Sequence, residues 1–251
     1  GRHLQIFTTG AEFYVPQTLD TPITPTNLIV KQQTAFGAKA GLRLQNVDGS
    51  TLFIQRQGKA IQEFIFSDAV QAYTSSKISL LSSHLLRTPE EMAVRVATST
   101  DEGDRLMLVN GDDGSIACYT LLRSQNVIAP SEWTTDGEFI NIGVDVDDIY
   151  VVVKRNVNTA DVYYVEIFDA DVLLDCSIVG GAAASVNMTH LEGETIKIIR
   201  DGIIEPDQTV PASPFTVTFA TAASTSHQVG LNFTPEVKTL PVEPNLSSGS
   251  L

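Results

Sequence analysis

Four stretches of this sequence repeat one layout, and this repetition limits the possible folds more than any other feature. Each has an apolar strand of about four residues, a polar turn, and a second strand that contains an aromatic residue. Their starting points are spaced by 48, 54 and 43 residues. The turns contain residue types that tolerate positive φ, as a tight hairpin requires. The stretches are Leu4–Val15, Leu52–Phe66, Leu106–Leu121 and Ile149–Phe168, and the turn residues are Gly10, Gly58, Gly111, Gly114, Asn156 and Asn158.

This spacing matches the roughly 40–50 residues of a propeller blade, in which the hairpin forms the middle pair of four strands. Because four hairpins need not close a ring, the pattern predicts an all-β chain with propeller-like β-blades, as a partial or irregular β-propeller. Unrelated hairpins in an ordinary sandwich are the alternative. The candidates for the flanking strands are Asn27–Thr34, Leu42–Val47, Met92–Thr98 and Phe139–Val144.

The character of the sequence changes after Asp175, so we expect two domains. Residues 1–175 form the propeller-like domain, and residues 176–251 form a smaller β-sandwich or barrel-like module. The small residues Gly180–Ser185 read as a linker or a tight bend, and the tail Pro241–Leu251 reads as frayed. The one helix that we expect is Ser76–Leu86, and the start at Gly1 suggests a piece of a longer protein. The strands expected in the module are Val186–Leu191, Thr195–Arg200, Phe215–Ala220 and Gln228–Phe233.

The chain is acidic, with 16 Lys and Arg against 30 Asp and Glu among 251 residues and a formal net charge of −14. Such a balance disfavours tight binding to nucleic acid phosphates. No apolar run approaches the ~18 residues of a membrane helix, so we expect no membrane span. Cys118 and Cys176 stand far apart in no metal-binding arrangement, which predicts two buried, reduced thiols.

Nothing in the sequence marks an active site, so we expect no enzyme, no catalytic residues, no cofactor and no metal site. Of the four histidines, only His190 lies near another potential ligand, because Glu192 would share its face on a strand. Trp133 reads as a core residue or as a platform for a sugar ring. The carboxylates cluster where turns are expected, which favours solvated turn residues over Ca²⁺ ligands or an acid–base pair. These clusters are Asp101, Glu102 and Asp104; Asp112 and Asp113; Asp145, Asp147 and Asp148; and Asp169, Asp171 and Asp175.

A series of short motifs resembles, in its order, the tail nozzle proteins of short-tailed phages, also called tail tubular protein B or stabilisation proteins. The resemblance runs from about residue 4 to residue 241, and the order of the motifs carries it. One departure is Met92–Thr98 (MAVRVAT), where the family commonly has a Trp. The motifs are Phe7–Val15 (FTTGAEFYV), Lys31–Gly37 (KQQTAFG), Leu52–Phe66 (LFIQRQGKAIQEFIF), Lys77–Leu86 (KISLLSSHLL), Asp113–Tyr119 (DGSIACY), Trp133–Gly137 (WTTDG), Val151–Arg155 (VVVKR), Tyr164–Phe168 (YVEIF), His190–Glu194 (HLEGE), Val229–Phe233 (VGLNF) and Lys238–Pro241 (KTLP).

The resemblance implies a structural protein of the virion tail that forms part of the conduit for DNA ejection. Its partners are then copies of itself in a ring, usually of six, the adaptor and portal ring proteins, and tail fibres or a needle. DNA would pass without tight binding, since a channel lined by carboxylates repels phosphates. The alternative is a carbohydrate-binding β module for receptor recognition, which Trp133 and an exposed Tyr73 would serve. A propeller hydrolase that uses a carboxylate pair is the third possibility.

Overall fold

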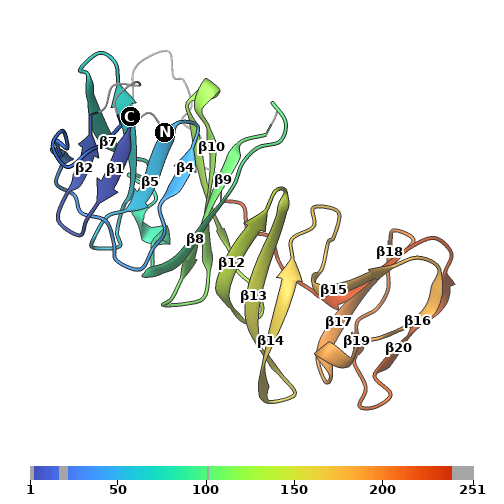
Figure 1. Cartoon of the computed structure of the whole chain (residues 1–251). Coiled ribbons are helices and arrows are strands. Elements are labelled where there is room, and N and C mark those ends of the chain that lie inside the picture. Colours follow the sequence, from blue (N-terminus) through green and yellow to red (C-terminus); the bar gives the residue numbers. More distant parts are fainter. Residues whose placement is uncertain (1–2, 17–21, 101, 239–251) are drawn as a thin grey trace, which may run out of the picture.

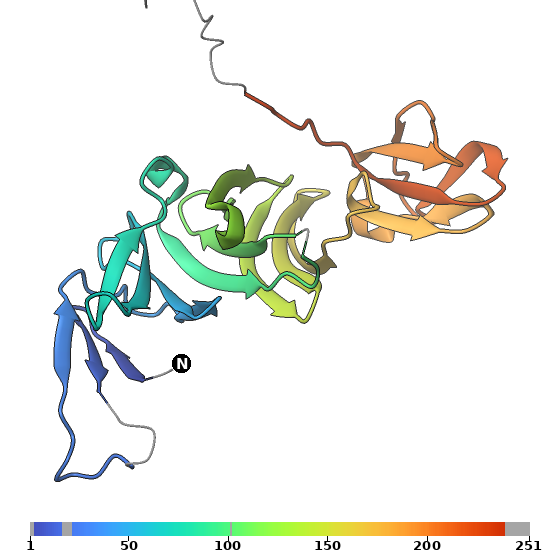
Figure 2. The same ribbon diagram turned by 90° about the horizontal axis from the view of Figure 1, so that it is seen from above.

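The computed structural model of the chain describes residues 3–16, 22–100 and 102–238. In these residues the chain is all-β: it forms several antiparallel sheets, none of which closes on itself, and no α-helix. The predicted frayed tail Pro241–Leu251 lies outside the described residues. Figures 1 and 2 show the sheets following one another along the chain, with the N-terminal sheet and the C-terminal strands at opposite ends.

Four sheets in sequence order make up the longer part of the chain, and each contains one of the predicted hairpins. The first sheet has the order β1-β2-β3, the second β4-β5-β6-β7, the third β11-β10-β9-β8 and the fourth β12-β13-β14. Their strands are β1 (Leu4–Phe7), β2 (Glu12–Val15), β3 (Lys31–Thr34), β4 (Gln45–Val47), β5 (Ser50–Ile54), β6 (Ile61–Ser67), β7 (Ala72–Lys77), β8 (Pro89–Arg95), β9 (Asp104–Asn110), β10 (Ile116–Leu122), β11 (Val127–Trp133), β12 (Glu138–Asp145), β13 (Asp148–Val157) and β14 (Ala160–Ile167).

All four predicted hairpins are confirmed, as β1–β2, β5–β6, β9–β10 and β13–β14. The predicted flanking strands are confirmed with shifted ends, as β3, β4, β8 and β12. The hairpin is the middle pair only in the two four-stranded sheets, however. In the first and fourth sheets, which have three strands, it lies at one side and leaves β1 and β14 as edges.

Residues that alternate along the strands pack these sheets face to face. In β9, Leu106 and Leu108 pack against Leu52 and Ile54 of the second sheet. Their neighbours in the sequence point to the opposite face, because successive side chains of a strand alternate. There Met107 and Val109 join the core of the fourth sheet, together with Ile149, Val151 and Val153. The inner strands β9 and β10 of the third sheet are therefore buried on both faces, whereas its edge strand β11 is exposed.

The C-terminal strands form two further antiparallel groups around a separate apolar core, which includes Ile196, Ile198, Val217, Phe219 and Val229. One group has the order β15-β21-β17-β18, with β19 also paired to β17, and the other pairs β16 with β20. These strands are β15 (Asp175–Gly180), β16 (Ala183–Asn187), β17 (Thr195–Arg200), β18 (Ile203–Ile204), β19 (Gln208–Thr209), β20 (Thr216–Ala223) and β21 (His227–Leu231).

One sequence-based expectation needs correction. The helix predicted over Ser76–Leu86 is wrong: β7 runs to Lys77, and only the 3-10 turn η1 (Ser83–Leu85) follows. Of its leucines, Leu85 and Leu86 join the core between the second and third sheets, whereas Leu80 and Leu81 are exposed. Of the two alternatives for Gly180–Ser185, the tight bend is confirmed, because the chain bends there between β15 and β16.

Gly114 lies in the turn between β9 and β10 of the third sheet and contacts the start of the fourth sheet so closely that no side chain fits there. Its φ is +63°, which favours glycine, and a Cβ there would lie 2.5 Å from Cβ and 2.7 Å from Cα of Glu138. The N–H of Phe139 donates to the Gly114 carbonyl over 2.8 Å, which fixes the start of β12 on this turn. The glycine is therefore required by both the backbone conformation and the approach of the next sheet.

We predict that Gly114→Ala lowers the free energy of unfolding by about 3 kcal/mol, because a positive-φ penalty adds to overpacking against Glu138. The matched control is Gly49→Ala, since Gly49 has φ +80° but nothing within 4 Å of its Cβ position. The control loses about 1 kcal/mol. Chemical denaturation of both variants measures the difference, and equal losses would contradict the close approach.

Candidate functional site

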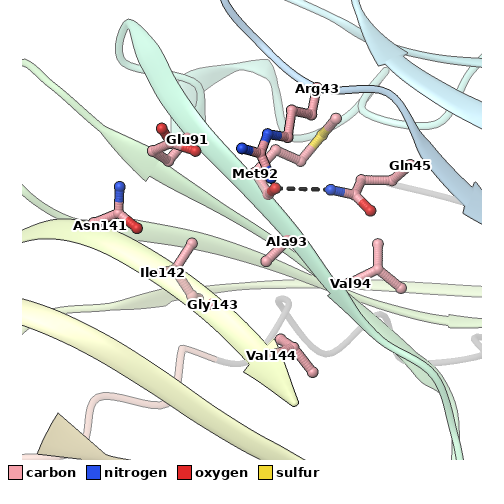
Figure 3. A pocket seen from close by; sticks show the side chains of 10 residues that line it. All are labelled: Arg43, Gln45, Glu91, Met92, Ala93, Val94, Asn141, Ile142, Gly143 and Val144. Carbon is pink, nitrogen blue, oxygen red and sulfur yellow. Dashed lines mark hydrogen bonds between the residues drawn. The ribbon is translucent and has the colours of Figure 1, made fainter. Parts of the chain in front are cut away.

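The first strands of the second, third and fourth sheets come together around a small groove (Figure 3). The side-chain amide of Gln45 on β4 donates to the Met92 carbonyl on β8 over 2.9 Å, which ties two of these strands together. The groove has a volume of about 330 Å³. Its described lining residues are Arg43, Gln45, Glu91, Met92, Ala93, Val94, Asn141, Ile142, Gly143 and Val144.

The chemistry of this groove is hydrogen bonding. Arg43 and Glu91 supply one charge of each sign, and Gln45 and Asn141 supply amides. The described lining offers no histidine, cysteine or hydroxyl, and Glu91 is its one carboxylate of the kind used in acid–base catalysis.

The strongest electrostatic feature is Arg155 on β13, where the fourth sheet meets the C-terminal strands. Its side chain is 2% exposed. Its Nε and Nη2 donate to the two carboxylate oxygens of Glu166 over 2.8 and 2.7 Å. Its Nη2 and Nη1 donate to the two oxygens of Asp175 over 2.9 and 3.1 Å, and Nη1 also donates to the Asp136 carbonyl over 2.8 Å. One guanidinium therefore holds β14, the start of β15 and the loop before β12.

The pKa values of this cluster follow from burial and pairing. Burial alone would lower the pKa of the Arg155 guanidinium, but its hydrogen bonds to Glu166 and Asp175 raise it well above the usual value. Burial would raise the pKa of Asp175, but hydrogen bonds from Arg155 and Thr135 hold it below its usual value. Arg155 and Asp175 are therefore both charged at neutral pH, and the guanidinium donates two hydrogen bonds to each of its carboxylate partners.

Within the described residues, four other arginines also lie between two carboxylates each. Glu102, Asp113, Asp147 and Asp175 of the predicted acidic clusters therefore pair with arginines, although Asp113 and Asp147 still lie in turns and are partly exposed. Asp169 accepts from the Asp171 N–H over 2.9 Å, as expected of a turn residue. Asp101 lies outside the described residues. The remaining pairs are Arg87 with Asp113 and Glu132, Arg95 with Glu102 and Asp147, Arg123 with Glu63 and Asp48, and Arg200 with Asp201 and Glu205.

The predicted pair of His190 and Glu192 does not share a strand face. His190 lies in the 3-10 turn η3 (Thr189–Leu191), and its Nε2 lies 3.1 Å from the Cys176 carbonyl oxygen. The described residues contain no group of three or more His, Cys, Asp or Glu that could hold a metal ion.

The two aromatic residues considered for sugar binding are used in packing. Trp133 is half-buried, and its ring centroid lies 4.8 Å from that of Phe168, beside the core between the third and fourth sheets. Tyr73, which the sequence suggested to be exposed, is buried and stacks on Phe64 at 4.7 Å. The expectation of an exposed Tyr73 is therefore wrong, because the second sheet uses this ring against the first.

Both cysteines are free thiols, as expected, but only Cys118 is fully buried. Burial raises the pKa of Cys118 to about 11 and that of Cys176 to about 12. Both remain protonated at neutral pH and are therefore poor nucleophiles.

Comparison with known proteins finds no matching family model and no matching curated protein. Within the described ranges, no helix has the length and apolar character needed to cross a membrane.

We predict that Arg155→Ala lowers the free energy of unfolding by about 3 kcal/mol, because it leaves the Glu166 and Asp175 carboxylates without their partner. Lys154→Ala is the matched control at the adjacent position, since Lys154 points to the solvent-facing side and pairs with Glu138 and Asp161 at 30% exposure. That control changes stability little. Denaturant titration compares the two, and a small loss in Arg155→Ala would show that the cluster does not hold the junction.

The stability contributed by this cluster depends on pH with a defined sign. Because the pKa of Asp175 is lower in the folded chain, its contribution is complete above the usual value of 3.8 and is lost as the pH falls through the folded value. We therefore expect the difference in unfolding free energy between the wild type and Arg155→Ala to narrow below about pH 4. Denaturation series between neutral pH and pH 2 measure it, and a constant difference would contradict the assignment.

Proposed function

We propose that this chain is a structural subunit of the tail nozzle of a short-tailed phage, located in the virion tail and forming part of the conduit for DNA ejection. It acts without a cofactor, in a ring of its own copies, most simply a hexamer. The ring contacts the adaptor and portal proteins on one side and fibres or a needle on the other. The observation that supports this proposal best is where the motifs of the resemblance lie in the fold.

These motifs supply the residues that join one sheet to the next. Phe7 from FTTGAEFYV packs at 5.1 Å on Phe53 from LFIQRQGKAIQEFIF. The segment DGSIACY supplies the buried residues Ile116 and Tyr119 to opposite faces of the third sheet. In VVVKR and YVEIF lie Arg155 and Glu166, which form the bidentate pair described above. The order of the motifs is therefore the order of the sheet contacts, which is what a shared fold requires.

Propeller-like blades are our interpretation of the four sheets. In a propeller the first strand of each blade lies nearest the axis. Here β4, β8 and β12, the first strands of three sheets, contact one another in series and line the groove of Figure 3. This arrangement fits an open arc of blades.

The net charge of −14 supports a conduit that does not retain DNA, because acidic walls repel closely spaced phosphates. The groove between the first strands carries Arg43 and Glu91 and is therefore balanced in charge. An acidic wall must be formed by other surfaces of the assembled ring. A carbohydrate-binding module has less support, since the rings of Trp133 and Tyr73 are engaged in packing.

We expect electron microscopy of the purified protein, alone and mixed with its adaptor ring, to show rings with an axial hole or tubes that grow from the adaptor. The sample without the adaptor ring is the control for tube growth. A protein that stays monomeric and does not bind the adaptor at any concentration would overturn the proposal. Binding of the same sample to a glycan array would then favour the carbohydrate-binding alternative.

A further inference from the structure

The series of sheets ends in an apolar face that nothing in the described structure covers. The fourth sheet uses one face, with Val151 and Val153, in the core shared with the third sheet. Its opposite face carries Tyr163, Val165 and Ile167 on β14, which are 63%, 75% and 50% exposed. The registered partners of Val165 and Ile167 on β13 are Val152 and Tyr150, so both strands are apolar at this end of the outer face, whereas Lys154 lies opposite Tyr163 at the other end and pairs with Asp161.

The apolar part of this outer face covers two strands. It consists of Tyr150 and Val152 on β13 and Tyr163, Val165 and Ile167 on β14, because β12 presents Asn141 and Gly143 beside Val152 and Tyr150. Neighbouring apolar side chains that are exposed to this degree mark an interaction site.

A complementary surface lies at the other end of the series, around the first sheet. Leu4 on β1 and Leu28, Ile29 and Val30 before β3 are exposed apolar residues. Charge also permits this contact: besides His3, the acidic and basic side chains in residues 3–16 and 22–34 are Glu12, which is buried, and Lys31. An N-terminal end with so little negative charge can approach the acidic rim of the fourth sheet, which includes Asp145, Asp148 and Asp161, without like-charge repulsion.

We infer that the outer face of the fourth sheet binds the N-terminal end of a second copy of this chain, so that the face-to-face packing of sheets continues from one copy to the next. The two surfaces differ, so the contact is head-to-tail, and repeated contacts of this kind close into a ring or extend as a filament. This inference rests on the proposed function, because it names the surfaces by which subunits of the conduit join.

The test uses two variants and their mixture. Val165→Glu places a charge on the outer face, and Ile29→Glu places one at the N-terminal end, where Ile29 is 58% exposed. Each variant alone is expected to be monomeric by light scattering coupled to size-exclusion chromatography, whereas the wild type associates. An equimolar mixture is expected to form a dimer of twice the mass, because each variant keeps the surface that the other has lost.

Leu81→Glu is the matched control, since Leu81 is 92% exposed away from both surfaces and should leave the association of the wild type unchanged. Circular dichroism confirms that each variant is folded. Wild-type association that persists in Val165→Glu, or a mixture that stays monomeric, overturns the inference while leaving the proposed function intact. The inference is also overturned if the wild type stays monomeric at 100 times the concentration used for the variants. The proposed function is overturned by a different result, namely that no rings form even when the adaptor is present.

Discussion

Burial of alternate residues on both faces of the central sheets is the interaction on which the rest of this structure depends. A strand sends successive side chains to opposite faces, so β9 can be apolar at four consecutive positions, from Leu106 to Val109, only if each face meets another sheet. Leu106 and Leu108 face one neighbour, and Met107 and Val109 face the other. The order of the sheets in space is thereby set by which residues of a single strand are apolar.

The polar contacts are arranged around this apolar series. Arg155 occupies an inward position on β13, two residues after Val153, where the pattern of the strand calls for an apolar side chain. Burying its charge is tolerated because Glu166 and Asp175 neutralise it with paired hydrogen bonds. The same arrangement of one arginine between two carboxylates is found at Arg87, Arg95 and Arg123, where the ion pairs connect strands or loops that are distant in sequence.

The sequence allowed the hairpins to be predicted because their signals are local. A short apolar run, a turn such as that at Gly58 and a second run specify neighbouring strands without reference to the rest of the chain. The helix expected over Ser76–Leu86 failed because the spacing of Leu81, Leu85 and Leu86 fits a helix face, whereas long-range contacts bury only Leu85 and Leu86 and leave Leu81 exposed. Arg155 was missed as a site for the same reason: its partner Asp175 lies 20 residues away and belongs to another sheet. The only local signal was a charge at an apolar position of an alternating strand.

The apolar contacts are divided among separate cores, one between each pair of neighbouring sheets and one among the C-terminal strands. A chain built in this way resembles a row of linked units, whose stability is set by each unit and its immediate neighbours. The third sheet has a core on each side, whereas the first sheet has one. Opening should therefore start at the ends of the row and reach β9 and β10 last, so that the chain can open at its ends while its centre stays folded.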